Sequence, residues 1–151
     1  MSTCTPRAIL AVAVLLATAS QAAAQNAVIG RIKSTTGAVF VVRQNGSLTA
    51  KPGDPLYESD SVRTGPDGRL GLTLKDETRV ALGPNSEVRV SQFAYSPGQG
   101  RLGMILRIAR GVVAYVSGRI AKLSPDAVRL ETPSAILGVR GTRMVIRVEV
   151  P

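Results

Sequence analysis

Short segments in which apolar and polar residues alternate recur along this chain, and they constrain its fold more than any other feature of the sequence. The clearest is RLGLTLK at residues 69–75, in which the apolar side chains share one side: Leu70, Leu72 and Leu74. Successive side chains of a β-strand point to opposite faces of a sheet. A period of two therefore predicts a strand with one buried face.

Turn sequences separate these segments at regular intervals. Asn45-Gly46 predicts a tight hairpin turn after residues 39–43, because glycine adopts positive φ without strain. Further turns are predicted at 51–55, 66–68, 83–85, 124–126 and 132–134, and a flexible loop at 96–100. Strands are thus expected about every 8 to 12 residues, a spacing typical of an all-β sandwich or barrel.

Two apolar segments need separate arguments. Residues 101–118 begin with helical spacing, but Gly103 and Gly111 disfavour a long helix and the second half is rich in β-branched residues, so we predict two strands. Residues 143–150 form a last strand that we expect to be paired inside a sheet, because an apolar edge invites aggregation. The sequence therefore predicts an all-β fold: a single β-sandwich or jelly-roll-like domain over residues 25–151.

The first 25 residues have the three-part layout of a secretory signal peptide. Arg7 lies in a short basic region, residues 8–19 are apolar, and Ala22 and Ala24 have the A-x-A spacing of a cleavage site. The apolar stretch is shorter than the ~20 residues that span a bilayer. We expect a helical signal peptide over residues 1–24, cleaved after Ala24, and a periplasmic or secreted mature chain without a transmembrane span. An uncleaved anchor is the alternative.

Missing residue types exclude most catalytic chemistry. The 151 residues contain no histidine, and the single cysteine, Cys4, precedes the apolar stretch and would be removed with it. The mature chain would then have no imidazole base, no thiolate, no His/Cys metal site and no disulfide. We therefore expect a protein that is not an enzyme and that has no cofactor and no metal.

The charge of the chain predicts anionic partners. Its formal net charge is +9 at pH 7, and arginine outnumbers lysine. Such a surface attracts lipid head groups, acidic polysaccharide, acidic proteins or nucleic acid. Export disfavours nucleic acid, and an aromatic content of 3% leaves few platforms on which bases or sugar rings could stack.

Four segments in consecutive order resemble the FecR domain family. They are GDPLYESDSVRTGPDGRLGLTL, LGPNSEVRV, ARGVVAYVSG and VRLETPSAILGVRGTRMVI, and the most specific part is TPSAILGVRGT at 132–142. The resemblance runs from Gly37 to Val148. It implies an extracytoplasmic β-domain best known from regulators of ferric citrate uptake, where the domain relays a signal from an outer-membrane transporter to a sigma factor.

This sequence departs from the family pattern at two points. Those regulators carry a cytoplasmic segment and a membrane span before the β-domain, whereas here a cleavable-looking signal is expected, which favours a stand-alone exported protein. The family's Asp-Gly turn is also replaced by Asp76-Glu77, which predicts a different turn type or a bulge.

Arg140, in LGVRGT, is the first candidate site residue. Gly138 and Gly141 could allow unusual φ or close backbone approach around it, and Thr142 follows. Three roles are open: a structural arginine paired inside the fold, a clamp for an anion, or an oxyanion stabiliser. The structural role would make Arg140→Ala destabilising, with Asp60, Asp76 or Glu131 as the carboxylate partner.

A second candidate is the acidic cluster of Asp54, Glu58 and Asp60. These carboxylates could hold calcium, but they lack the spacing of a calcium loop, and Asp54 between Gly53 and Pro55 fits a turn former. A carboxylate-only hydrolase would need a cleft.

The remaining arginines form the third candidate. Arg69, Arg79 and Arg89 alternate with apolar residues and could share one sheet face, and others are spread over the later strands: Arg101, Arg107, Arg110, Arg119, Arg129 and Arg147. Such a face is either a solvated surface or an anion-binding surface, with Tyr95 and Tyr115 as candidate contacts or as packing residues. The sequence favours an exported binding module for an envelope protein, with a role in signal transduction open. A carbohydrate- or lipid-binding accessory of the envelope is the alternative.

Overall fold

The computed structural model describes residues 27–150. The expected signal peptide, the cleavage site after Ala24 and the boundary at residue 25 lie outside these residues. The described chain forms twelve strands, one short α-helix and two 3-10 turns, which are β1 (Val28–Thr36), β2 (Val39–Arg43), β3 (Gly46–Thr49), β4 (Pro55–Tyr57), β5 (Ser61–Thr64), β6 (Arg69–Leu74), β7 (Arg79–Leu82), β8 (Glu87–Ser96), η1 (Pro97–Gln99), β9 (Arg101–Val116), α1 (Arg119–Leu123), η2 (Pro125–Ala127), β10 (Val128–Glu131), β11 (Ile136–Gly138) and β12 (Arg143–Val148).

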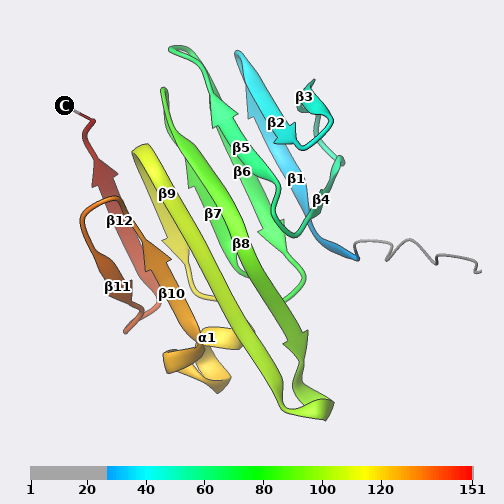
Figure 1. Ribbon diagram of the computed structural model, residues 1–151, viewed down its shortest axis with the longest axis vertical. Coiled ribbons are helices and arrows are strands. Elements are labelled where there is room, and N and C mark those ends of the chain that lie inside the picture. The colour runs from blue at the N-terminus through cyan, green and yellow to red at the C-terminus, as the bar shows by residue number, and fades with distance from the viewer. Residues whose placement is uncertain (1–26, 151) are drawn as a thin grey trace, which may run out of the picture.

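The strands belong to one continuous sheet that curls over, so that its two parts face each other (Figure 1). We call these parts layer A and layer B. Layer A has the order β4-β1-β6-β7-β9-β12, and layer B has the order β3-β2-β5-β8-β9-β10-β11. All neighbours are antiparallel except β9 and β10, which are parallel. The all-β prediction is confirmed, and the two layers are joined because β9 belongs to both.

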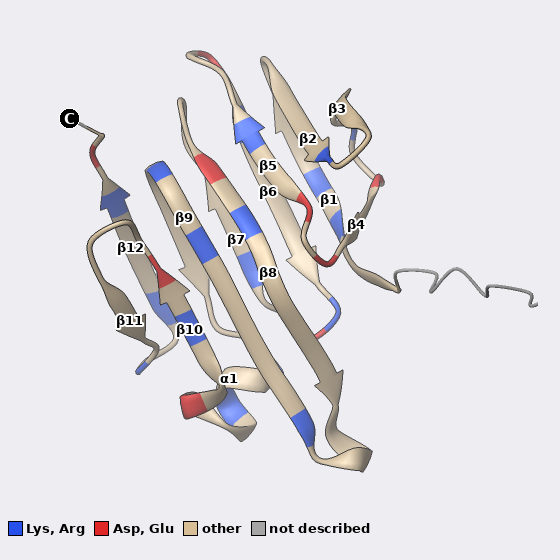
Figure 2. Cartoon of the chain, viewed as in Figure 1, with Lys and Arg blue, Asp and Glu red and all other residues tan. Residues whose placement is uncertain are grey.

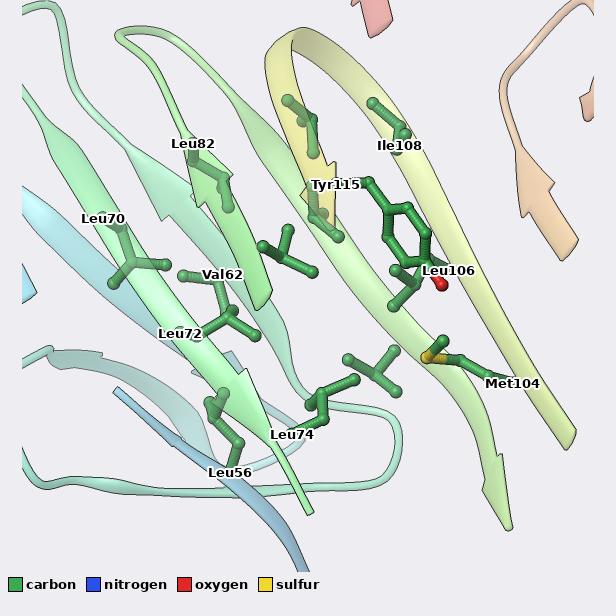
Figure 3. Close-up of a cluster of buried hydrophobic side chains, with 14 of the residues drawn as sticks. Leu56, Val62, Leu70, Leu72, Leu74, Leu82, Met104, Leu106, Ile108 and Tyr115 are labelled. Atoms are coloured by element: carbon green, nitrogen blue, oxygen red, sulfur yellow. The ribbon is translucent and has the colours of Figure 1, made fainter. Parts of the chain in front are cut away.

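The core lies between the layers and follows from the alternation in the sequence. In β6 and β7 the buried residues are every second one, and the same holds for β5 and the start of β8. Figure 3 shows Val62 and Leu106 of layer B pointing towards Leu72 and Tyr115 of layer A. The apolar side of these strands therefore packs inward, and their other side faces solvent.

The segment predicted as two strands is one strand that changes layer. The first half of β9 pairs with β8 as far as Arg110, and the second half, from Gly111, pairs with β7 and β12. Gly111 has φ +93, and a side chain there would collide with Ser86. The conformational freedom that argued against a helix is used for a bend within the strand.

Three local predictions are corrected. The hairpin loop is Gln44-Asn45, one residue earlier than expected, because Arg43 pairs directly with Gly46. At the Asp76-Glu77 turn, Glu77 adopts the positive φ that glycine would take without strain, with φ +69. A helix, α1, lies where we expected none; it has only five residues.

The last strand is also placed differently. We expected it inside a sheet, but among the described residues β12 pairs only with β9 and forms an edge of layer A. Its edge position is compatible with the sequence because Arg143 and Arg147 interrupt the apolar run, and charged residues protect edge strands from aggregation.

Candidate functional site

The outward side of layer A gathers basic residues from distant parts of the sequence. Arg79 of β7 lies opposite Val116 of β9 and Thr73 of β6. Val116 in turn lies opposite Arg143 of β12, and Thr73 opposite Arg31 of β1. The register therefore places three arginines in one row across five strands. Since neighbouring strands are about 4.8 Å apart, that row extends for roughly 20 Å.

A parallel row of small residues lies beside this one. It crosses the same five strands at Ser34, Gly71, Ala81, Ala114 and Val145. On its far side, Arg69 lies opposite Thr36 and Arg147 opposite Val112. Lys33 occupies the irregularity in β1 between Ile32 and Ser34 and lines the same groove as Gly71 and Arg79. Ser34, Gly71, Ala81 and Ala114 thus form a low floor with cations along both sides, and the exposed side chain of Val145 lies at its β12 end.

We call the six cations of this surface the arginine face: Arg31, Lys33, Arg69, Arg79, Arg143 and Arg147. All six are exposed. Among the described residues none of them takes part in an ion pair. The groove on this face has a volume of about 860 Å³, and its one acidic residue, Glu77, is already paired with Arg119 at 3.2 Å.

Layer B carries arginines too, but many of them are neutralised. Glu87 lies 3.3 Å from Arg63 and 3.9 Å from Arg110, and Glu131 lies 2.7 Å from Arg107. Figure 2 shows basic residues on strands of both layers and acidic residues on β8 and β10 of layer B. Arg89, Arg101 and Arg129 of layer B also have no ion-pair partner, so in the described chain both layers keep unpaired cations, and the arginine face holds six of them.

The predicted basic surface is divided between the two layers. Arg69 and Arg79 lie together on the arginine face, but Arg89 belongs to β8 on the outside of layer B, so the three do not share a face. The prediction was wrong because the alternation of apolar and polar residues indicates which side of a strand is buried, but it does not indicate to which layer the strand belongs. Arg31 and Arg143 were missed, and only strand register could have brought them together.

Arg140 does not have the buried position expected of a structural arginine. Its side chain is exposed and, among the described residues, makes no hydrogen bond or ion pair, whereas the neighbouring Val139 is buried. Gly138 and Thr142 are exposed as well, and Gly141 has φ +115 at the turn into β12. The segment is thus anchored by an apolar side chain, and the arginine points outward.

The carboxylates proposed for Arg140 have other partners. Asp60 is buried and pairs with Arg43 at 3.1 Å, and Glu131 pairs with Arg107. Asp76 is fully buried and accepts hydrogen bonds from the Thr78 hydroxyl and from the backbone N–H groups of Thr78 and Ile120. A partly buried arginine–carboxylate pair does exist in this fold, but its arginine is Arg43.

The acidic cluster is likewise divided among separate structural contacts. Asp54 accepts the backbone N–H of Lys51, as a turn former does, and Glu58 accepts that of Phe93. The described residues contain no group of three acidic, histidine or cysteine side chains arranged to hold a metal. Tyr115, considered as a contact residue, is fully buried, and burial raises the pKa of its hydroxyl.

None of the helices in the described part of the chain is long and apolar enough to cross a membrane. A model of the family described as "FecR protein" matches residues 60–150. A solved structure described as "Cell surface anchoring domain" aligns with 42% of this chain and 84% of its own, at 34% sequence identity and a TM-score of 0.39. A search of curated proteins found no match.

Proposed function

The chain belongs to the FecR protein family, and from that premise we propose that it is a non-catalytic binding module of the cell envelope whose arginine face holds an acidic partner protein. The observation that carries this proposal is the set of six exposed cations without an ion-pair partner among the described residues. Positive charge concentrated on one surface raises the local concentration of anions and accelerates encounter with them.

Binding, and not chemistry, fits the residues of this surface. It offers guanidinium and ammonium groups, hydroxyls of Ser34, Thr36 and Thr73, and a floor of small side chains. The chain has no histidine, and residues 27–150 contain no cysteine. A cationic surface without a base or nucleophile can orient and retain an anion but lacks the groups needed to transform it.

A protein partner is favoured over the two alternatives named from the sequence, glycan and lipid. The outward positions of the five strands that form this face, β1, β6, β7, β9 and β12, hold no aromatic ring, so a sugar would find no stacking platform there. A membrane would meet a recessed floor between basic side chains, whereas an acidic polypeptide could follow the groove. In the family setting, such a module would serve to relay a signal through protein contacts.

The test compares two charge reversals that change the net charge equally. The first, Arg31→Glu with Arg79→Glu, alters the arginine face; the control, Arg89→Glu with Arg129→Glu, alters layer B. Each protein, as the full chain or as exported, is titrated with poly-glutamate, alginate and phosphatidylglycerol vesicles.

We expect poly-glutamate to bind the unaltered protein and the control with similar affinity. The arginine-face variant should bind at least about tenfold more weakly, as a loss of about 1.4 kcal/mol would give. Equal loss in both variants would contradict the location of the site. If the unaltered protein binds alginate or the vesicles more tightly than poly-glutamate, the partner is a glycan or a lipid surface and not an acidic protein.

A further inference from the structure

The edge of β12 offers unpaired main-chain groups next to the arginine face. Ser117 donates its N–H to the carbonyl of Thr142 at 2.9 Å. In an antiparallel ladder, hydrogen-bonded pairs recur at every second residue, so the residues of β12 that bond to β9 are Met144, Ile146 and Val148. The N–H and C=O groups of Arg143, Val145 and Arg147 then point away from β9, towards the free edge.

Among the strands at the ends of the two layers, β12 leaves the longest edge open in the described chain. β12 has six residues, whereas the edge strands β3, β4 and β11 have four, three and three. At its centre, Val145 is 68% exposed, with the exposed side chains of Arg143 and Arg147 on either side. A strand laid against β12 would meet an apolar residue between two cations.

The charges of β12 discourage pairing with a second copy of the chain. In an antiparallel pair centred on Val145, Arg143 of one copy would lie opposite Arg147 of the other. Like charges directly opposite each other on neighbouring strands are destabilising, and opposite charges are stabilising. An acidic strand would turn both repulsions into attractions.

We infer that β12 binds an extended acidic segment of a partner protein by strand addition, with carboxylates opposite Arg143 and Arg147 and an apolar residue opposite Val145. The added strand extends layer A, and its main chain bonds to the free groups of β12. This inference rests on the proposed function, since it uses two cations of the arginine face, and it adds the secondary structure and charge pattern of the partner.

The probe is the synthetic peptide Thr-Glu-Thr-Val-Thr-Glu-Thr, whose pattern is the same in both directions and therefore fits β12 in parallel or antiparallel orientation. The decisive variant is Val145→Pro, which removes an N–H that β9 does not use and places a ring at the edge. Proline is tolerated on edge strands where the N–H would face solvent. Val145→Thr is the matched control, because it keeps the N–H and the β-branched shape.

We expect Val145→Pro to weaken peptide binding by about tenfold or more relative to Val145→Thr, which keeps the N–H at this position. A peptide that is N-methylated at its valine and at the threonine that follows should bind the unaltered protein with a similar loss, because one of these N–H groups donates to Val145 in the antiparallel orientation and the other in the parallel orientation. This second measurement does not depend on how the proline variant folds. Circular dichroism establishes that both variants retain the sheet.

Equal peptide affinity of the proline and threonine variants, together with full affinity of the N-methylated peptide, would overturn strand addition. A different result would contradict the proposed function. It is an equal affinity of the arginine-face variant and its layer B control for poly-glutamate. A peptide in which both glutamates are replaced by lysine should not bind, and binding by it would contradict the charge pattern that we assign.

Discussion

At the scale of single residues, Asp60 forms a partly buried ion pair with Arg43. Its carboxylate accepts the Nε–H of Arg43 and the backbone N–H of Tyr57, and Arg43 donates a further bond to the carbonyl of Pro55. The guanidinium also lies 4.9 Å from the centre of the Tyr57 ring. One carboxylate thus connects β2 with β4 and the turn before β5, and its removal would leave several polar groups without partners.

Asp60→Ala should lower the free energy of unfolding by about 2 kcal/mol, because the partly buried Tyr57 N–H and the Arg43 guanidinium lose their acceptor. Arg140→Ala, by contrast, should change it by less than about 0.5 kcal/mol, as expected for an exposed side chain. Urea unfolding of both variants measures the two free energies of unfolding and so tests both predictions. A loss at Arg140 equal to that at Asp60 would restore the structural role expected of Arg140 from the sequence.

At the scale of elements, β9 determines the architecture because it carries the chain from layer B to layer A. The bend is fixed by Ser86, which is buried: its hydroxyl donates to the carbonyl of Val112, and its oxygen accepts the N–H of Val112. Gly111 lies against Ser86 with no room for a β-carbon and with φ +93. Both the conformation and the close approach require glycine at this position.

Gly111→Ala should therefore destabilise the protein by about 3 kcal/mol, which is the sum of left-handed strain and of overpacking against Ser86. Gly138→Ala is the matched control, because the site of its added β-carbon is open and its φ is not in the left-handed region. It should cost little. Thermal unfolding of both variants tests the contrast, and an equal midpoint for the two would show that β9 does not depend on glycine for its bend.

At the scale of the whole molecule, a single core and a shared strand couple the two layers. The buried residues form one cluster with members from both layers, including Val41, Val88, Leu72 and Ile146. Neither layer could keep its inner face away from water after losing the other, because apolar burial is the main favourable contribution to folding.

The protein should consequently unfold in one cooperative transition. Far-UV circular dichroism follows the strands of both layers, while tyrosine fluorescence, to which the buried Tyr115 contributes together with Tyr57 and Tyr95, follows the core between them. We expect the two signals to give the same urea midpoint, which is the usual sign of two-state behaviour. Two separated midpoints would mean that one layer can persist without the other.

The sequence by itself determined the class of the fold and the side on which most residues lie. Alternation in RLGLTLK required a strand with its leucines inside, and Leu70, Leu72 and Leu74 are indeed buried. The absence of histidine and the excess of arginine, both independent of conformation, favoured anion binding over catalysis. Local chemistry sufficed for these conclusions because a period of two is set by the backbone of one strand.

Tertiary structure alone decided which residues meet. Arg31, Arg79 and Arg143 are far apart in the sequence and share a row only because β1, β6, β7, β9 and β12 pair in a particular register. The same pairing put Arg89 on the other layer, gave Asp60 to Arg43 instead of Arg140, and left β12 at an edge. Strand order and register depend on packing between distant segments, and no property of a single segment encodes them.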